Sequence, residues 1–370
     1  MKIRILTFSD KGESVAKKLC KKTMASWDID FMRCGETISL SQWTGEWFYE
    51  ADALVFVGAC GIAVRAVAPF VESKVTDPAV VVIDELGSYA IPILSGHLGG
   101  ANELAIKLAK VIGAVPVITT ATDINGVFAI DEWAKRNECT IIDPQKIKDI
   151  SGRLLDGGNI TIKSNFPIIG EEPAGVTLTS DDGADVHIST RVGGIFGGRT
   201  PHGAALHHGA AVSHSTAAPH GAMSGSSDDS HEKKDPMIIV PRLAVLGIGC
   251  RKGVGVDAIE SCFEHVLKSL DIYEAAFYKV CTIDLKEHEP GIREFCKAHR
   301  LPLYLYSSRD LKKVPGEFTS SGFVEEITGV DNVCERSAAC GATDAQIVLK
   351  KQVWEGVTMA VAFRKISLEW

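Results

Sequence analysis

Apolar runs and amphipathic segments alternate along most of the chain, which is the pattern of an α/β protein. Met1–Phe8 alternates apolar and polar residues as a first strand does, and a Lys-rich amphipathic helix is expected over Glu13–Lys22. Asp52–Val57 is an almost continuous apolar run, which predicts a strand buried on both faces. This run leads into a glycine turn at Gly58, and a short helix is expected from there to Pro69.

The stretch from Val80 to Gly113 combines several signals. Two apolar runs predict strands at Val80–Ile83 and Tyr89–Leu94, and a Gly-rich loop, Ser95–Asn102, follows them. A helix is expected next, because apolar residues recur at the spacing of one helix face, at Leu104, Leu108, Val111 and Ile112. Gly113 then has the position of a C-cap. Backbone N–H groups at the start of this helix would suit a carboxylate or a phosphate.

Shorter elements follow this stretch. Two helices are expected over Asp131–Asn137 and Lys146–Leu155, and short strands between turns fill the region from Asn159 to Val192. A second α/β pattern starts near Arg242. It predicts strands and helices at Leu243–Ile248, Val256–Leu270, Pro290–His299, Leu303–Tyr306, Ile347–Lys350 and Val357–Phe363.

Residues 193 to 236 differ from the rest because Gly, Ala, Ser and His dominate them. Six of the eleven histidines lie here, and the composition lacks the apolar residues that a core needs. We interpret this stretch as a flexible linker, in which the histidines either capture a metal or belong to a low-complexity insertion without a role. The expected architecture is α/β throughout: an N-terminal open-sheet domain over 1–130, a small middle domain over 131–195, the His-rich linker over 196–238 and a separate C-terminal domain over 239–370.

Composition narrows the class of protein. The chain has 370 residues, 45% of them hydrophobic and 23% charged, which is typical of a globular protein. Its net charge of −8 argues against nucleic acid as a partner. No apolar run approaches the ~18 residues that cross a bilayer, and Met1–Phe8 reads as a strand instead of a signal sequence. The ten cysteines are scattered without a Cys-x-x-Cys pair, so we expect a reduced, cytoplasmic protein with no membrane partner.

Polar residues and glycines follow three of the predicted strands, which end near residues 58, 94 and 119. In an open α/β sheet the carboxyl ends of parallel strands form the ligand crevice, so we expect these loops to converge. The candidate binding residues of this region are Gly58, Gly61, Arg65, Ser95, Gly96, Gly99, Gly100, Asn102, Thr119 and Thr120. Arg65 is equally suited to a surface ion pair, and Cys60, a possible nucleophile, lies in an apolar setting that favours packing.

A second glycine loop opens the C-terminal domain. Gly247, Gly249 and Gly253 resemble the dinucleotide fingerprint, but their spacing is one residue too long, so NAD binding is rejected. The Gly-x-x-x-x-Gly-Lys-Ser/Thr phosphate loop is absent as well. Candidate anion-binding residues in this loop are Gly249, Arg251, Lys252 and Gly253. No His/Cys/Asp/Glu set has the spacing of a metal site, so no metal is expected.

Several motifs together resemble one family. They are Gly61–Arg65, Thr76–Val81, Leu94–Asn102 and Thr119–Asp123 in the first half, and Gly247–Gly253, Asp284–Lys286, Gly329–Val330 and Thr358–Ala362 in the second. In this order they are similar to CbiG, the cobalt-precorrin-5A hydrolase family of anaerobic cobalamin biosynthesis. The resemblance spans nearly the whole chain and departs from the family pattern at the His-rich linker.

The resemblance implies a hydrolase that acts on a cobalt-containing tetrapyrrole. Such an enzyme opens a δ-lactone and expels a two-carbon fragment as acetaldehyde, giving cobalt-precorrin-5B. Cobalt then belongs to the substrate, and no cofactor of the protein is implied. Neighbouring enzymes of the corrin pathway are the candidate protein partners.

Lactone opening requires a proton acceptor for water and hydrogen-bond donors for the oxyanion. His97 is the only histidine in the first 186 residues, and we expect it to be the acceptor. Backbone N–H groups of Gly99, Gly100 and Ala101 are the candidate donors. Carbon–carbon cleavage also needs acid and base groups, for which Asp84, Glu85 and Asp123 are the candidates.

Two alternatives stay open at this point. A loop histidine such as His97 often caps a helix and does no chemistry. The protein as a whole is alternatively a non-catalytic carrier of corrinoid intermediates, for which the C-terminal domain, poor in catalytic residue types, is suited.

Overall fold

The computed structural model describes residues 1–22, 27–35, 38–73, 76–193 and 235–370. Contacts divide the chain into two compact units. Unit 1 consists of Met1–Ile160, Ile169–Thr177 and Glu369–Trp370, and unit 2 of Thr161–Ile168 and Leu178–Leu368. Most of the predicted linker, 196–234, lies outside the described residues. All ten cysteines are free.

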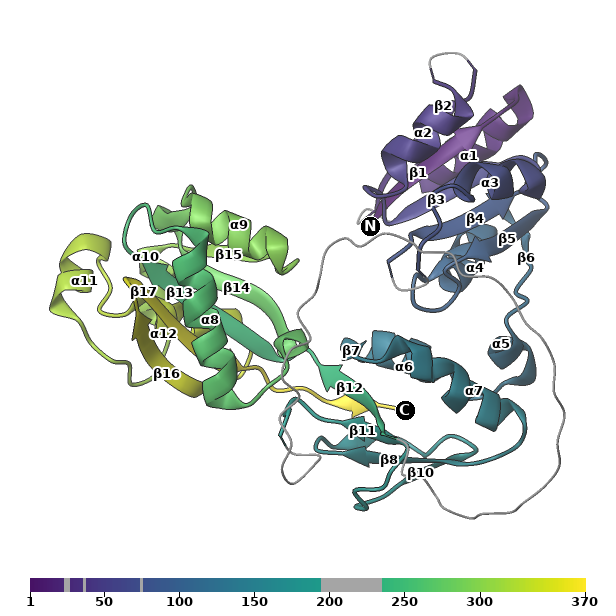
Figure 1. Ribbon diagram of the computed structural model, residues 1–370. Coiled ribbons are helices and arrows are strands. Elements are labelled where there is room, and N and C mark those ends of the chain that lie inside the picture. Colours follow the sequence, from purple (N-terminus) through teal and green to yellow (C-terminus); the bar gives the residue numbers. More distant parts are fainter. Residues whose placement is uncertain (23–26, 36–37, 74–75, 194–234) are drawn as a thin grey trace, which may run out of the picture. The chain divides into compact units, whose positions relative to one another are not determined.

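Unit 1 is built on a six-stranded sheet (Figure 1). Its order is β2 (Asp28–Arg33), β1 (Lys2–Thr7), β3 (Ala53–Val57), β4 (Ala79–Ile83), β5 (Tyr89–Leu94) and β6 (Val115–Pro116). The first four strands are parallel. β5 runs antiparallel to β4, and β6 is parallel to β5.

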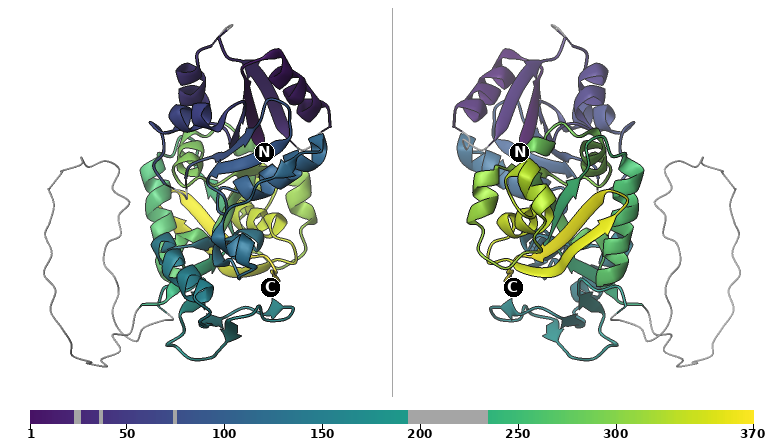
Figure 2. Two further views of the ribbon diagram at one scale, coloured as in Figure 1. Left: turned by 90° about the vertical axis from the view of Figure 1, so that its right-hand side faces the viewer. Right: turned by 90° about the vertical axis from the view of Figure 1, so that its left-hand side faces the viewer.

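Helices cover both faces of this sheet, because both faces of its central strands are apolar. Ile3 and Val55 pack with residues of α1 (Asp10–Lys22) and α4 (Ala101–Ile112). Leu6 and Phe56 point the other way and pack with α2 (Leu40–Trp47) and α3 (Cys60–Val67). The side views in Figure 2 show the sheet between these two helical layers. The predicted α/β class is confirmed.

The direction of β5 changes the predicted convergence of loops. Val80, at the start of β4, pairs with Leu94, at the end of β5. The end of β3 lies at the opposite end of β4, since Val57 pairs with Ile83. The loops after β5 and β6 therefore meet at one edge, whereas the loop after β3 lies at the other. The expectation that all three converge was wrong, because it assumed parallel strands throughout.

Smaller elements follow in unit 1 and carry the chain to the next strands. They are α5 (Ala121–Asn125), α6 (Ile130–Arg136), β7 (Cys139–Ile141), a 3-10 turn at Pro144–Lys146 and α7 (Ile147–Leu155). Short strands follow: β8 (Ile160–Ser164), β9 (Ile168–Ile169), β10 (Val176–Leu178) and β11 (Val186–Ile188). The helices α6 and α7 agree with the predicted ones to within one residue at each end.

In unit 2, β11 pairs in parallel with β8 on one side and with β12 (Met237–Pro241) on the other. Met237 and Ile238 are buried strand residues, although the predicted linker extended to residue 238. β12 thus continues the sheet of the predicted middle domain, while its residues from 239 onward were assigned to the C-terminal domain.

The rest of unit 2 is a five-stranded sheet with helices on both faces. Its order is β15 (Leu303–Tyr306), β14 (Phe277–Ile283), β13 (Ala244–Cys250), β17 (Val357–Phe363) and β16 (Gln346–Trp354). Its helices are α8 (Val256–Leu270), α9 (Pro290–Ala298), α10 (Ser308–Lys313), α11 (Gly322–Thr328) and α12 (Val333–Gly341). Short 3-10 turns lie at Glu274–Ala276 and Asp284–Lys286, and the last strand is β18 (Leu368–Glu369). The bounds of α8 and β15 are those expected from the sequence.

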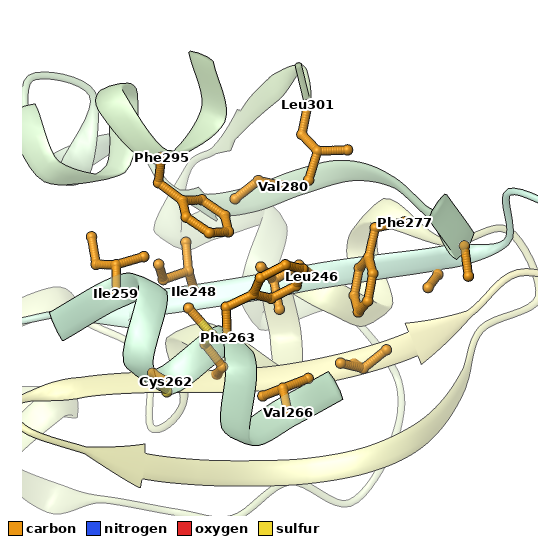
Figure 3. Packing of buried hydrophobic residues seen from close by; sticks show 14 of the residues in the cluster. Leu246, Ile248, Ile259, Cys262, Phe263, Val266, Phe277, Val280, Phe295 and Leu301 are labelled. Carbon is orange, nitrogen blue, oxygen red and sulfur yellow. The ribbon is translucent and has the colours of Figure 1, made fainter. Parts of the chain in front are cut away.

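Successive side chains of β13 point to opposite faces of this sheet, and each face is covered by different helices. Leu246 packs with α8 and α9, where the ring of Phe263 lies 5.1 Å from those of Phe277 and Phe295 (Figure 3). Val245 points to the other face and packs with α12. Gly247 is required there, because a Cβ atom would lie 1.9 Å from the carbonyl oxygen of Cys334 on α12. The near-miss dinucleotide motif thus contains a glycine that helix packing demands.

Candidate active site

The loop between β5 and α4 closes on itself around His97. Three backbone hydrogen bonds hold it: Gly100 N–H to His97 O (2.9 Å), Ala101 N–H to Ser95 O (3.1 Å) and Asn102 N–H to Gly96 O (3.0 Å). Two of the three N–H groups expected to stabilise an oxyanion, those of Gly100 and Ala101, are therefore engaged inside the loop. That part of the sequence interpretation was wrong for these two groups.

Two glycines make this tight loop possible. A Cβ atom on Gly99 would lie 2.2 Å from the Cβ of Ser95, closer than two carbon atoms can approach. Gly100 has a φ of 83°, in the left-handed region that glycine adopts without strain. Ser95 adopts a φ of 55° although it is not glycine, and its buried Oγ has no hydrogen-bond partner among the described residues. The glycines therefore allow the tight loop that carries His97, and the buried Ser95 packs against Gly99 within this loop.

The imidazole of His97 lies between carboxylates. Its Nδ1 is 3.2 Å from Oδ2 of Asp131, and its Nε2 is 3.1 Å from Oδ2 of Asp123. Oε1 of Glu132 lies 3.5 Å from the same Nε2, and the hydroxyl of Thr122 lies 3.3 Å from it. The side chains of His97 and Asp131 are only 11% and 9% exposed, so these charges interact away from bulk water. We call His97, Asp123, Asp131 and Glu132 the histidine–carboxylate cluster.

Asp123 is presented by α5 and oriented by α4. Thr120 is the N-cap residue of α5, and Asp123 lies in its first turn. The side-chain amide of Asn102 donates to Oδ2 of Asp123 at 2.8 Å and to the hydroxyl of Thr120 at 2.9 Å. Asn102 itself is 4% exposed. Three residues that the sequence predicted for the site, Asn102, Thr120 and Asp123, thus form one hydrogen-bonded group, and Asp123 connects it to His97.

α6 presents Asp131 and Glu132. Both lie in its first turn, where a negative charge interacts favourably with the helix dipole. The buried Ile130, Trp133 and Ala134 hold the helix in place. Neither acid was assigned to the site from the sequence, because the predicted domain boundary between residues 130 and 131 separated both from His97. Two adjacent acids at the start of an apolar helix were the available signal.

The carboxylates determine the charge of His97. Burial by itself lowers the pKa of His97, but the hydrogen bond and charge of Asp131, with Asp123 and Glu132, outweigh it and raise that pKa from 6.5 to about 9. Burial likewise opposes ionisation of Asp131, yet the hydrogen bond and positive charge of His97 lower the pKa of Asp131 overall. At neutral pH the pair is therefore an imidazolium next to a carboxylate.

Glu132 has the opposite tendency. Burial, together with the negative charges of Asp123 and Asp131, raises the pKa of Glu132, although the charge of His97 acts against this. A carboxyl group whose pKa is raised toward neutrality is suited to exchange protons with a substrate. His97 was expected to be the proton acceptor of the site; its raised pKa favours the charged form, which has no free lone pair to accept a proton at neutral pH.

A cavity of ≈ 220 Å³ borders the cluster. Asp123, Glu132 and Thr122 line it together with Phe128, Trp133 and Arg136. A second cavity, of ≈ 600 Å³, is lined in part by Leu98, Gly99 and Gly100 of the same loop, together with Lys107 and Lys135. Both cavities lie within unit 1.

The cluster also contains donor types that bind divalent cations. Within the described ranges, one group of three side chains has its donor atoms close enough for a metal ion, namely His97, Asp123 and Glu132, all within 4.8 Å of one another. Sequence spacing did not reveal this group, because its members lie on three separate elements.

Asp84 and Glu85 are not part of the cluster. They follow β4, and the antiparallel β5 carries the chain back to the opposite edge before His97 is reached. Asp84 accepts hydrogen bonds from the N–H groups of Leu86, Ser88 and Tyr89, and Glu85 accepts one from Ser9. Both stabilise local structure, so their assignment as catalytic groups beside His97 was wrong.

The other predicted binding residues are spread out. Gly58 follows β3 at the edge of the sheet opposite His97, and Gly61 and Arg65 lie in the first and last turns of α3. Thr119 is exposed just before α5. Gly96 belongs to the His97 loop, where its carbonyl accepts from Asn102.

The C-terminal glycine loop lies in unit 2. Gly249 packs against Thr358, and the N–H of Arg251 donates to the carbonyl of Gly356. The N–H of Gly253 donates to Glu289 at 3.0 Å, so a carboxylate of the chain occupies this part of the predicted anion cradle. The side chains of Arg251 and Lys252 are exposed.

The fold and the cluster define an α/β protein with an acid–base site. Residues 42–123 match the family model of the cobalamin synthesis G N-terminal region, and residues 244–362 match that of the cobalamin synthesis G C-terminus. The chain belongs to the cobalamin synthesis G (CbiG) family, as its sequence motifs indicated.

Curated relatives cover most of the chain. It is 32% identical over 319 residues to the cobalt-precorrin-5A hydrolase of Salmonella typhimurium, covering 85% of this chain and 82% of the relative. It is 29% identical over 323 residues to the cobalt-precorrin-5A hydrolase of Priestia megaterium, covering 85% and 79%. A solved cobalamin biosynthesis protein G homologue from Sulfolobus solfataricus shares 21% identity, with coverages of 98% and 97% and a TM-score of 0.38. No helix in the described part of the chain is long and apolar enough to cross a membrane.

Proposed function

We propose that this protein hydrolyses cobalt-precorrin-5A. The two relatives with that name align over most of the chain, and the family membership supports the same activity. The protein is thus an enzyme of cobalamin biosynthesis. The observation that carries the mechanism is His97 held as an imidazolium between Asp131 and Asp123, with Glu132 beside it. Nothing favours the alternative of a non-catalytic carrier, which would not require such a cluster.

Lactone opening requires one proton acceptor and one proton donor. Glu132 is the proposed acceptor: its raised pKa suits it to take a proton from the water that attacks the lactone carbonyl. His97 is the proposed donor, which stabilises the developing oxyanion and then protonates the leaving alkoxide. Asp131 keeps His97 oriented through Nδ1 and favours its charged form.

After lactone opening, Glu132 holds the proton taken from water and His97 has lost one, so transfer of that proton from Glu132 to His97, 3.5 Å away, restores both groups. Release of acetaldehyde then uses the same groups in a second step. A carboxylate, Asp123 or Glu132, accepts the proton of the alcohol on the two-carbon fragment. The bond to the macrocycle breaks as the carbonyl of acetaldehyde forms, and the electron pair remains on the macrocycle. A proton from His97 then neutralises that carbon, so that atoms and charges balance.

We propose that cobalt enters the site only as part of the substrate and that no resident cofactor takes part. Arg136 lines the cavity beside Glu132 and is the proposed partner of a substrate carboxylate. Arg251 and Lys252 stay candidates for the same task in unit 2. A cytoplasmic location and contacts with neighbouring enzymes of the corrin pathway complete the proposal.

The test compares His97→Gln with the wild type under anaerobic conditions. Acetaldehyde release from cobalt-precorrin-5A is measured with a coupled alcohol dehydrogenase assay, and lactone opening is followed by mass spectrometry. We expect kcat to fall on the order of 100-fold or more, because acid–base catalysis is lost. His288→Gln is the matched control, since His288 lies exposed in unit 2 with 86% of its side chain accessible. Unchanged acetaldehyde release by His97→Gln would refute the assignment.

A further inference from the structure

Three aromatic rings pack together at α6, the helix that carries Asp131 and Glu132. The ring of Trp370 lies 5.7 Å from that of Trp133 and 5.9 Å from that of Phe128. Trp133 belongs to α6 and is 1% exposed, and both partners of Trp370 line the cavity that Glu132 and Asp123 border. Trp370 therefore supports the cavity wall although 237 positions of sequence separate it from Trp133.

Hydrogen bonds hold the same segment to the end of α6. Asn137 is the C-cap residue of this helix. Its side-chain oxygen accepts from the N–H of Glu369 at 2.7 Å, and its side-chain nitrogen donates to the carbonyl of Glu369 at 3.0 Å. The N–H of Trp370 donates to the carbonyl of Ile169 at 3.0 Å. The backbone N–H and carbonyl groups of Glu369 thus both bind the side-chain amide of Asn137, which fixes the direction of the C-terminal segment.

These contacts act on the helix that presents two members of the histidine–carboxylate cluster. α6 spans only seven residues, Ile130–Arg136, and a helix of this length is not stable without tertiary contacts. Its first turn holds Asp131 and Glu132 at 3.2 Å and 3.5 Å from the His97 ring nitrogens. A small rotation or shift of α6 would lengthen both distances together. Glu369 and Trp370 contact the middle and the end of this helix, while its beginning contacts His97.

We propose that Glu369 and Trp370 are positioning residues for the reaction: by clamping α6 through Asn137, Trp133 and Phe128, they hold Asp131 and Glu132 against His97. This inference rests on the proposed function and adds residues that touch neither the His97 ring nor the atoms of the cluster. By contact, Glu369 and Trp370 belong to unit 1, whereas the residues that directly precede them belong to unit 2. The two residues that clamp α6 therefore come after the segments of unit 2 in the sequence.

Trp370→Ala in the full chain tests the proposal. We expect kcat to fall on the order of 10- to 100-fold with KM little changed, because the reacting groups are misplaced while the binding surface remains. Trp370→Phe should recover most of the rate, since a ring again fills the space. Trp354→Ala is the matched control: it also removes a tryptophan, but one that is 41% exposed in unit 2.

A second readout separates a clamp from general stabilisation. The pKa of His97, followed by NMR of histidine-labelled protein and assigned with His97→Gln, should fall from about 9 toward 6.5 in Trp370→Ala and in Asn137→Ala. It should not change in Trp354→Ala. If Trp370→Ala does not fold, Asn137→Ala tests the same clamp, since it removes both hydrogen bonds to Glu369 together with the one that the Asn137 amide donates to the carbonyl of Trp133 at 2.9 Å.

Different results would contradict the proposed hydrolase function and the positioning role of Glu369 and Trp370. A wild-type protein that releases no acetaldehyde would overturn the proposed function, while the His97 titration would still measure the clamp. Wild-type values of both kcat and the His97 pKa in folded Trp370→Ala would overturn the positioning role.

Discussion

His97 carries a charge because each of its ring nitrogens faces a carboxylate. A neutral imidazole has one donor and one acceptor nitrogen, and it would leave either Asp131 or Asp123 facing a lone pair. The protonated ring satisfies both acids at once. The proposed mechanism uses this charged His97 as the proton donor and Glu132, 3.5 Å from Nε2, as the proton acceptor.

The raised pKa of His97 predicts how stability depends on pH. Because its pKa is about 9 in the folded protein and 6.5 without these partners, the folded state binds this proton more tightly. The stabilisation is complete below about pH 6.5 and disappears as the pH rises through about 9. The melting temperature of wild type should therefore exceed that of His97→Gln most at pH 6 and approach it near pH 9.5. An unchanging difference over this range would contradict the charged His97.

Metal removal distinguishes proton transfer from metal catalysis in the same cluster. Protein treated with a strong chelator and shown to be metal-free by mass spectrometry is expected to keep its full rate, because the proposed mechanism uses only proton transfers by side chains. Loss of activity that Zn²⁺, Mn²⁺ or Co²⁺ restores would instead show that His97, Asp123 and Glu132 hold an ion.

At the scale of elements, the site depends on one loop and two short helices, of which α5 supplies Asp123. The loop before α4 brings the ring of His97 to the acids, and it closes only because Gly99 has no side chain. α6 presents Asp131 and Glu132 from its first turn. None of these elements is rigid by itself, so hydrogen bonds within the loop and packing around Trp133 fix the distances between them.

Gly99→Ala is predicted to disturb the loop and the chemistry together. Its Cβ would also lie 2.7 Å from the carbonyl oxygen of Ser95, so the loop must open, at a cost of about 1–3 kcal/mol of stability. We expect a lower melting temperature and a kcat reduced on the order of 10-fold or more.

Gly61→Ala is the control for this substitution. A Cβ at Gly61 meets no atom within 4 Å, and the residue lies in α3 at the other edge of the sheet. Stability should stay the same or rise by up to about 1 kcal/mol, with activity unchanged. Equal effects of the two alanines on kcat would contradict the role of the loop.

At the scale of the whole molecule, the two units are interleaved along the chain. β12, at residues 237–241, pairs with β11 at residues 186–188, across the segment 194–234. Glu369 and Trp370 return to unit 1 from the far end of the sequence. A cut near residue 195 therefore separates strands that pair and removes the clamp on α6.

A fragment of residues 1–195 is predicted to be unstable for this reason. It lacks β12, so β11, whose residues Val186 and Ile188 are at most 1% exposed in the full chain, would lose one of its two neighbouring strands. We expect aggregation or dye binding typical of exposed apolar surface, and a rate well below that of the full chain. Co-expression with residues 235–370 should restore a soluble complex in size-exclusion chromatography. A stable, fully active fragment 1–195 would contradict the interleaved fold.

Local patterns predicted the elements of this fold well. The helix Val256–Leu270 and the strand Leu303–Tyr306 were expected with their observed bounds. Asn332 caps α12, where its side-chain oxygen accepts from the N–H of Glu335 at 2.8 Å. These features depend on residues near one another in sequence, where apolar spacing and capping side chains act. The C-cap at Gly113, with a φ of 79°, is another such case.

The sequence by itself determined the α/β class, the family motifs and His97 with Asn102 and Asp123 as candidate residues. Only the tertiary structure decided which acids surround the imidazole. The antiparallel direction of β5 moved Asp84 and Glu85 away, and the packing of α6 brought Asp131 and Glu132 near. Strand direction and side-chain proximity depend on contacts between distant segments, which periodicity does not encode. The charge of His97 follows from these contacts, because its pKa is set by neighbours 26 to 35 positions away.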